Sequence, residues 1–131
     1  MLIISLNVRG INNRRKRFLV HEYFESFKPV LLALQETHLA HSDAHYLVDL
    51  GLKRVIASKQ ICKTKGVAIL ARQPPTSKPR SLSDASGRWT IVYIQRHSFS
   101  FTLRTVYGAV LDDSEATDVV CAELNSCPVP L

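Results

Sequence analysis

The stretch Val30-Leu31-Leu32-Ala33-Leu34-Gln35-Glu36-Thr37-His38 places a carboxylate directly after a short apolar run. An uninterrupted apolar run of this length is typical of a β-strand that is buried on both faces. We therefore expect the strand to end at the rim of a sheet and to deliver Glu36 there. The rim at the strand ends is where α/β proteins commonly hold their functional groups.

The beginning of the chain repeats this arrangement, because the apolar run Leu2-Ile3-Ile4-Ser5-Leu6 stops at the polar Asn7. Between the two runs, residues 13–27 predict a helix with one apolar face, formed by Val20, Tyr23, Phe24 and Phe27. Strand, helix and strand in succession predict two parallel strands whose ends bring Asn7 and Glu36 to the same rim. An amide and a carboxylate in that position could hold a hard divalent cation.

The remainder of the chain predicts one α/β domain with a mixed sheet and flanking helices. We expect a short helix or turn at 40–50, strands at 53–58 and 66–71, a loop at 73–87, a hairpin of strands 88–95 and 99–107, and a helix at 112–124. In the second hairpin strand, alternate side chains share one face: Phe99, Phe101, Leu103, Thr105 and Tyr107. Tyr107 therefore also stands at a strand end.

The charged residues are unevenly distributed along the chain. The net charge is +6, and all 17 Lys and Arg residues precede Leu111, whereas several acids follow it. Such a field favours a polyanionic partner, most often nucleic acid. The run Arg14–Arg17 lies in the first turn of the predicted helix, where the helix dipole disfavours cations. A nearby phosphate backbone would explain this placement; a loop-like helix start or a solvated basic face are the alternatives.

The cysteines and the hydropathy pattern narrow the class of protein further. The three cysteines, Cys62, Cys121 and Cys127, are odd in number and lack metal-ligand spacing, so we expect reduced thiols. The chain opens without a basic-then-apolar leader, and no apolar stretch approaches the ~18 residues of a membrane span. These features predict an intracellular protein of the nucleus or cytoplasm with no membrane partner.

Five motifs occur in a recognisable order over residues 1–107: Asn7 after the first strand, Gln35-Glu36-Thr37-His38, Gly66-Val67-Ala68-Ile69-Leu70, Gly87-Arg88-Trp89 and Val106-Tyr107. Together they resemble the endonuclease/exonuclease/phosphatase superfamily. The Glu-Thr-His and Gly-Arg-aromatic motifs are most similar to the endonuclease domain of non-LTR (LINE-type) retrotransposons. Apurinic endonucleases and exonuclease III are near relatives of that domain.

The resemblance implies a fold, a reaction and a set of site residues. The fold is the first half of a four-layer, DNase I-like α/β sandwich, and the reaction is Mg²⁺-dependent cleavage of phosphodiester bonds in DNA, with Mn²⁺ as a possible substitute. Glu36 would bind the metal, Asn7 would support the metal and the catalytic site, and Tyr107 would contact the scissile phosphate. The residues expected to contact DNA are Arg14, Arg15, Lys16, Arg17, His38, Lys63 and Lys65.

Each of these residues also has a simpler interpretation. Glu36 could be a surface carboxylate paired with an arginine, and Asn7 could be a turn former before Gly10. Tyr107 could be a core tyrosine with its hydroxyl at the rim, and His38 could be exposed to solvent.

The departures from the family pattern predict weak activity. Gly108-Ala109-Val110 follows Tyr107 where the family usually has a polar segment, and the family's later Gly-Asp-Phe-Asn and Ser-Asp-His motifs are absent. We therefore expect a truncated domain without its second sheet. Loss of a general base typically slows catalysis 10²–10⁴-fold. The alternatives are a non-catalytic basic DNA-binding fragment and a remnant without function; a separate C-terminal half, or a longer polyprotein with a reverse transcriptase, could complete the parent element.

Overall fold

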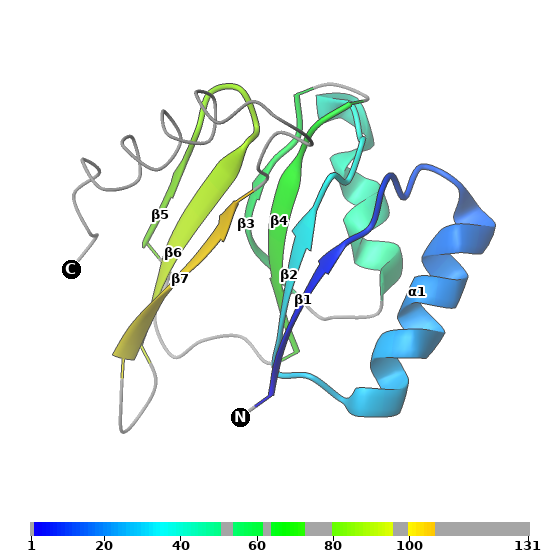
Figure 1. Cartoon of the computed structure of the whole chain (residues 1–131), viewed down its shortest axis with the longest axis horizontal. Helices are drawn as coiled ribbons and strands as arrows, with labels where there is room; N and C mark the ends of the chain where they lie inside the picture. The colour runs from blue at the N-terminus through cyan, green and yellow to red at the C-terminus, as the bar shows by residue number, and fades with distance from the viewer. Residues whose placement is uncertain (1, 51–53, 62–63, 73–79, 96–99, 107–131) are drawn as a thin grey trace, which may run out of the picture.

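The computed structural model describes residues 2–50, 54–61, 64–72, 80–95 and 100–106. Its elements are β1 (Ile3–Asn7), α1 (Arg14–Phe27), β2 (Leu31–Gln35), the 3-10 helix η1 (His41–Leu50), β3 (Arg54–Lys59), β4 (Val67–Ala71), β5 (Arg80–Ser83), β6 (Trp89–Gln95) and β7 (Ser100–Val106). They form a mixed α/β fold in which helices, a first sheet and a second sheet follow one another as layers (Figure 1). The predicted fold class is therefore confirmed.

The first sheet has the strand order β1-β2-β4-β3. β1 and β2 are parallel, as the sequence predicts, and their register pairs Asn7 with Gln35. β4 runs antiparallel to both β2 and β3, with an irregularity in β3 between Val55 and Ala57. β2 and β4 are central strands, which explains why their apolar runs are continuous rather than alternating.

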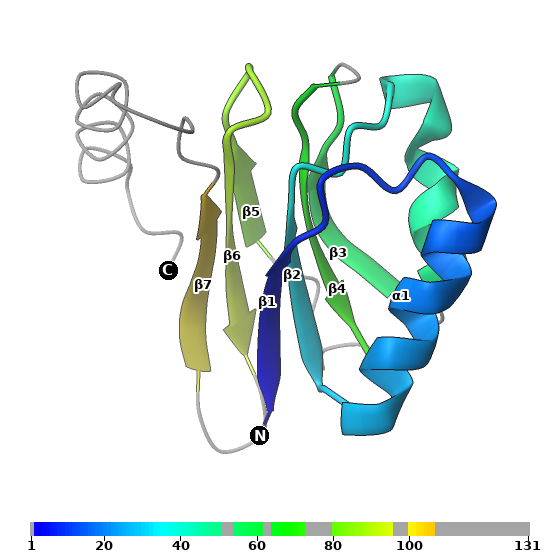
Figure 2. The same cartoon turned by 45° about the vertical axis from the view of Figure 1, so that its right-hand side comes forward.

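α1 and η1 cover one face of the first sheet (Figures 1 and 2). α1 begins after Asn13, whose side chain accepts a hydrogen bond from the Lys16 amide, and it ends at Lys28 in the left-handed conformation. The buried residues beneath the helices form the helix-side core: Val8, Ile11, Phe24, Leu32, Leu34, Leu39, Leu47, Leu50, Ala68 and Leu70. This core packs on the helix side of the first sheet, whose strands β1 and β2 lead to Asn7 and Glu36.

The apolar face of α1 differs from the prediction. Phe24 is 1% exposed and Val20 packs against the core, but Tyr23 and Phe27 are 53% and 50% exposed. The difference arises because α1 also docks against η1, where the buried Arg17 binds Asp49. The helix therefore buries the side that carries Arg17 and Phe24 and leaves Tyr23 and Phe27 at the surface.

A second sheet, which we expected to be absent, packs on the other face of the first. It contains the antiparallel strands β5-β6-β7. The two sheets enclose the inter-sheet core, whose buried members are Leu31, Ala33, Ile69, Ala71, Val92 and Ile94. β5 falls within the segment predicted as a loop, because it is a short strand that pairs with β6 and has mainly exposed side chains. Such a strand has no strong hydrophobic pattern.

Two further predictions concern other parts of the chain. The helix expected at 112–124 lies outside the described residues. Within the described ranges, no helix has the length and apolar character needed to cross a membrane.

Candidate functional site

The site lies at one end of both sheets, which we call the rim: the ends of β1, β2 and β7, the starts of β4 and β6, and the loops that join them. The loops after β1 and β2 continue the pairing of these strands, since the amides of Val8 and Gly10 donate to the carbonyls of Gln35 and Glu36 at 3.0 and 2.7 Å. Asn7 and Glu36 therefore lie on neighbouring chain segments at the same rim, as the sequence predicts.

The backbone at the rim is strained. Glu36, His38 and Arg9 adopt φ angles of 53°, 55° and 48°, in the left-handed region that residues other than glycine rarely enter. Hydrogen bonds hold the Glu36 loop in this shape, because the amides of Thr37 and His38 donate to the carbonyls of Gly66 and Lys65. Strained residues of this kind cluster at functional sites, where the surrounding structure enforces them.

The side chain of Glu36 is only 10% exposed. A carboxylate that is withdrawn from water to this extent requires a compensating partner or cation. Its Oε2 lies 3.4 Å from Nε2 of His38, so the side chain paired with it is a histidine rather than the arginine of the simpler interpretation. The ring of His38 lies over Gly10, where an added Cβ would approach Nδ1 to 2.9 Å.

Asn7 is exposed at the rim and forms a turn. Its Oδ1 accepts a hydrogen bond from the Arg9 amide at 3.1 Å, which is the local role that the turn interpretation predicts. Asn7 also lies beside the Glu36 loop, and its role in supporting a metal is a proposal. Among the described residues, no three His, Cys, Asp or Glu side chains gather into a metal-binding group. Mg²⁺ commonly uses one or two carboxylates with waters and phosphates, so Glu36 with Asn7 is compatible with a partial site.

A glutamine that sequence reasoning treated only as part of a motif connects the two sheets at the rim. Gln35 Nε2 lies 2.5 Å from Thr105 Oγ1 on β7 and 3.0 Å from Ser5 Oγ on β1. The signal for this role is the alternation in β2, because Leu31 and Ala33 face the second sheet and Gln35 follows in the same series. A polar residue at that position requires a partner between the sheets.

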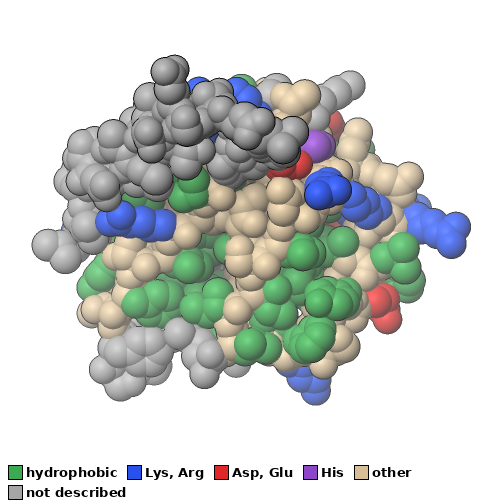
Figure 3. Space-filling view, viewed as in Figure 1, with side chains coloured by type: hydrophobic (Ala, Val, Ile, Leu, Met, Phe, Trp, Pro, Cys, Tyr) green, Lys and Arg blue, Asp and Glu red, His purple; other side chains and the backbone are tan. Residues whose placement is uncertain are grey.

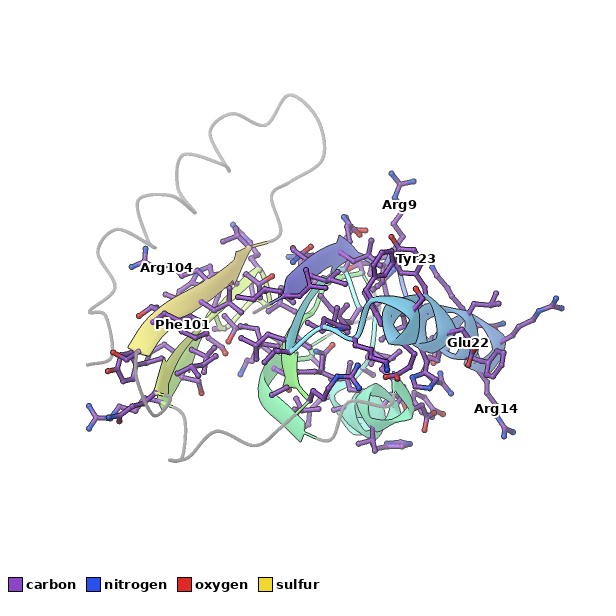
Figure 4. All side chains as sticks on the ribbon, turned by 90° about the horizontal axis from the view of Figure 1, so that it is seen from below. Arg9, Arg14, Glu22, Tyr23, Phe101 and Arg104 are labelled. Carbon is purple, nitrogen blue, oxygen red and sulfur yellow. The ribbon has the colours of Figure 1, made fainter. Side chains whose placement is uncertain are left out.

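Exposed cations follow the end of β1, in its loop and in the first turn of α1, although not all of the predicted ones are exposed. Arg14 and Arg15 are exposed, as is Arg9, which the sequence analysis did not single out. Figure 4 shows Arg9 and Arg14 extending away from the body of the protein. In the view of Figure 3, Lys and Arg side chains lie close to histidine and acidic side chains near the top of the molecule. Lys16 Nζ donates to the Arg9 carbonyl at 3.1 Å and so fastens the loop after β1 to α1.

Arg17 departs from the expected role as a DNA contact. It is 4% exposed, its Nε binds Asp49 Oδ2 at 3.1 Å, and its guanidinium lies 4.0 Å from the centre of the Tyr46 ring. It also donates to the carbonyls of Ile11 and Asn12. These contacts place Arg17 in the joint between α1 and η1, which explains a cation in the first helical turn without any phosphate.

Of the three remaining predicted site residues, the structure describes one. Lys65 is partly buried, and its carbonyl accepts the His38 amide. Tyr107 and Lys63 lie outside the described residues.

Solved structures of known proteins share this fold. The AP endonuclease from Archaeoglobus fulgidus has a TM-score of 0.63 at 21% identity, over 95% of this chain and 49% of that one. Truncated TDP2 from Caenorhabditis elegans has a TM-score of 0.64 at 16% identity, over 95% and 52%. The AP endonuclease LMAP from Leishmania major has a TM-score of 0.59 at 20% identity, over 82% and 40%.

These likenesses establish the fold. The chain spans between 40% and 52% of the length of these three structures. A family model, described as the Endonuclease/Exonuclease/phosphatase family, matches residues 4–117 and therefore includes both sheets and the rim. The chain belongs to the Endonuclease/Exonuclease/phosphatase family.

Proposed function

We propose that this chain descends from a Mg²⁺-dependent DNA endonuclease and keeps part of its site, with Glu36 as metal ligand, Asn7 as its neighbour and Tyr107 as phosphate contact. The observation that carries the proposal is Glu36 itself. It is a largely buried carboxylate on a left-handed backbone, at a rim with exposed arginines. Membership of the family and the likeness to two AP endonucleases support a phosphodiesterase ancestry.

Each group would have a separate task. A bound Mg²⁺, or Mn²⁺ in its place, supplies a Lewis acid that polarises a phosphoryl oxygen and offsets the charge on the leaving oxygen. Glu36 contributes negative charge in a partly dehydrated position, where electrostatic interactions are stronger than in water. The exposed cations Arg9, Arg14 and Arg15 would hold the phosphate backbone and so position the DNA without reading its sequence.

We further propose that these 131 residues alone are inactive or strongly impaired. The sequence carries neither a Gly-Asp-Phe-Asn nor a Ser-Asp-His motif of the kind that supplies the family's base and phosphate contacts. Without a general base, the rate falls by roughly 10²–10⁴-fold.

The first experiment measures metal binding and DNA nicking separately. Mn²⁺ binding to the purified chain is followed by electron paramagnetic resonance, and nicking of supercoiled plasmid is assayed with Mg²⁺ or EDTA. Glu36→Gln should abolish Mn²⁺ binding, whereas Glu22→Gln, a change at an exposed acid on α1, should not. Equal Mn²⁺ affinity in both variants would refute the metal site. Nicking that disappears with EDTA and with Glu36→Gln would refute the claim of impairment.

A second candidate function is DNA binding without catalysis, which the exposure of Arg9, Arg14 and Arg15 favours. Fluorescence anisotropy with duplex DNA at several salt concentrations tests it. Arg14→Ala and Arg15→Ala should each lower the salt slope by about one, whereas Arg80→Ala, at an exposed cation at the start of β5, should leave it unchanged. Salt-sensitive binding that survives Glu36→Gln, without nicking, would establish this function. If the folded chain binds no DNA, the remaining alternative is a remnant without function.

The retroelement origin is a further part of the proposal. It is supported by the motifs Glu36-Thr37-His38 and Gly87-Arg88-Trp89, which are similar to those of LINE-type endonucleases. Affinity for an intact duplex and for the same duplex with one abasic site distinguishes the two ancestries. A strong preference for the abasic duplex would favour the apurinic type over the retroelement type.

A further inference from the structure

The side chains between the two sheets change from apolar to polar toward the rim. Among the described residues, the buried side chains of the inter-sheet core farther from the rim are apolar, such as Ala33 on β2 and Val92 on β6. One layer closer to the rim, Gln35 and Thr105 meet through a 2.5 Å contact from Nε2 to Oγ1, and Thr105 is 2% exposed. A directional polar contact therefore joins the two sheets at the end that carries Glu36.

Thr105 belongs to a row of hydroxyl groups on the inner face of the second sheet. The strand register pairs it with Thr90 on β6, and Thr90 with Ser83 on β5. Residues directly opposite each other on antiparallel strands share a face. The Thr90 hydroxyl lies 3.1 Å from the Leu82 carbonyl and 2.7 Å from Ser83 Oγ, so its contacts are within its own sheet. Thr90 and Thr105 are thus chemically alike, but the Thr105 contact crosses to the first sheet.

We infer that Gln35 is a positioning residue whose hydrogen bond to Thr105 fixes the end of β7 relative to the end of β2. Gln35 directly precedes Glu36, and Thr105 lies two residues before Tyr107 in the sequence. The bond therefore holds the end of β7 beside the end of β2, next to Glu36. This inference rests on the proposed DNA-binding function, and it adds the pair that holds the two sides of that site in place.

Apolar and polar contacts restrain the two sheets in different ways. Apolar packing is non-directional, and its strength follows the area that is removed from water. A hydrogen bond has a preferred distance and angle, so it also specifies the lateral position. The Gln35 amide also donates to Ser5 Oγ on β1, so hydrogen bonds to both β1 and β7 hold it in place.

Three variants test the inference, together with the unmodified chain. Thr105→Val removes the hydroxyl at nearly constant volume, and Thr105→Ser keeps it. Thr90→Val removes a buried hydroxyl of the same layer that makes no bridge. Amide hydrogen exchange of β7 residues 104–106 and affinity for duplex DNA are measured for each.

We expect Thr105→Val to accelerate exchange at the end of β7 and to weaken DNA binding about tenfold, the equivalent of one hydrogen bond. Thr105→Ser should restore both values, and Thr90→Val should change neither. Gln35→Leu combined with Thr105→Val should weaken binding little more than either change alone, because both remove the same contact.

The two readouts separate the possible failures. Equal exchange at the end of β7 in Thr105→Val and Thr90→Val would overturn the inference, whatever the DNA affinity. Faster exchange in Thr105→Val with unchanged DNA affinity would also overturn it and leave the proposed function intact. An unmodified chain that does not bind DNA would refute the proposed function itself.

Discussion

The helix-side core and the rim are built on the same strands, yet different forces determine them. Leu34 in β2 is completely buried among apolar side chains and stabilises the fold. Two residues later, Glu36 has a left-handed backbone and a carboxylate with little access to water, both of which raise the free energy of the folded state. The difference teaches that a residue that stabilises the fold and a candidate site residue that strains it lie only two positions apart in the chain.

The largest change in the free energy of unfolding is expected for a substitution in the helix-side core. Leu34→Ala leaves a cavity beneath α1, so we expect the free energy of unfolding to fall by about 3–4 kcal/mol. Leu19→Ala, at a helix position that is 56% exposed, should change it by less than about 0.5 kcal/mol. Urea unfolding monitored by circular dichroism measures both. Similar losses in the two variants would contradict the burial of β2.

Two of the three arginines in the first turn of α1 sharpen the comparison, because Arg17 is buried and Arg14 is exposed. Arg17→Met leaves the Ile11 and Asn12 carbonyls without their donor and should lower the free energy of unfolding by about 2 kcal/mol. Arg14→Met should change it by less than about 0.5 kcal/mol. Urea unfolding of the two variants side by side provides the measurement. A larger loss for Arg14→Met would reverse the assignment of the two residues.

A substitution at the rim should instead raise the free energy of unfolding. Glu36→Gly removes a buried charge and relieves the left-handed conformation, so we expect the free energy of unfolding to rise by about 1 kcal/mol. Mn²⁺ binding should be lost at the same time. Glu22→Gly, in the middle of α1, should instead lower the free energy of unfolding by about 1 kcal/mol. Thermal unfolding and Mn²⁺ titration test the pair; destabilisation by Glu36→Gly would remove the argument from strain.

The same division explains what could be predicted from the sequence. β2 and β4 are recognisable because each is a continuous apolar run, and β1 because only Ser5 interrupts its apolar run; the parallel pairing of β1 and β2 follows from the helix between them. These two results are sufficient to place Asn7 and Glu36 at one rim. The family motifs added the mixed α/β sandwich, which the structure has.

Other features depend on contacts between distant residues and have no local signal. The burial of Arg17 requires Asp49 in η1, and the bridge from Gln35 requires Thr105 in the second sheet. The left-handed conformation of Glu36 and His38 is held by hydrogen bonds with the neighbouring loops, and glutamate is not among the residue types enriched in it. β5 escaped prediction because a short, exposed edge strand lacks a hydrophobic pattern.

The order of the strands along the chain has a consequence for biosynthesis. The first sheet is made entirely from residues 3–71, and the second entirely from residues 80–106. At a translation rate of about 5–20 residues per second, the last strand of the second sheet emerges about 2–7 s after the first sheet is complete. During that interval the inner face of the first sheet, with Leu31, Ala33 and Ile69, has no second sheet to cover it. The nascent chain therefore presents an apolar surface that a ribosome-associated chaperone can bind before β6 and β7 close over it.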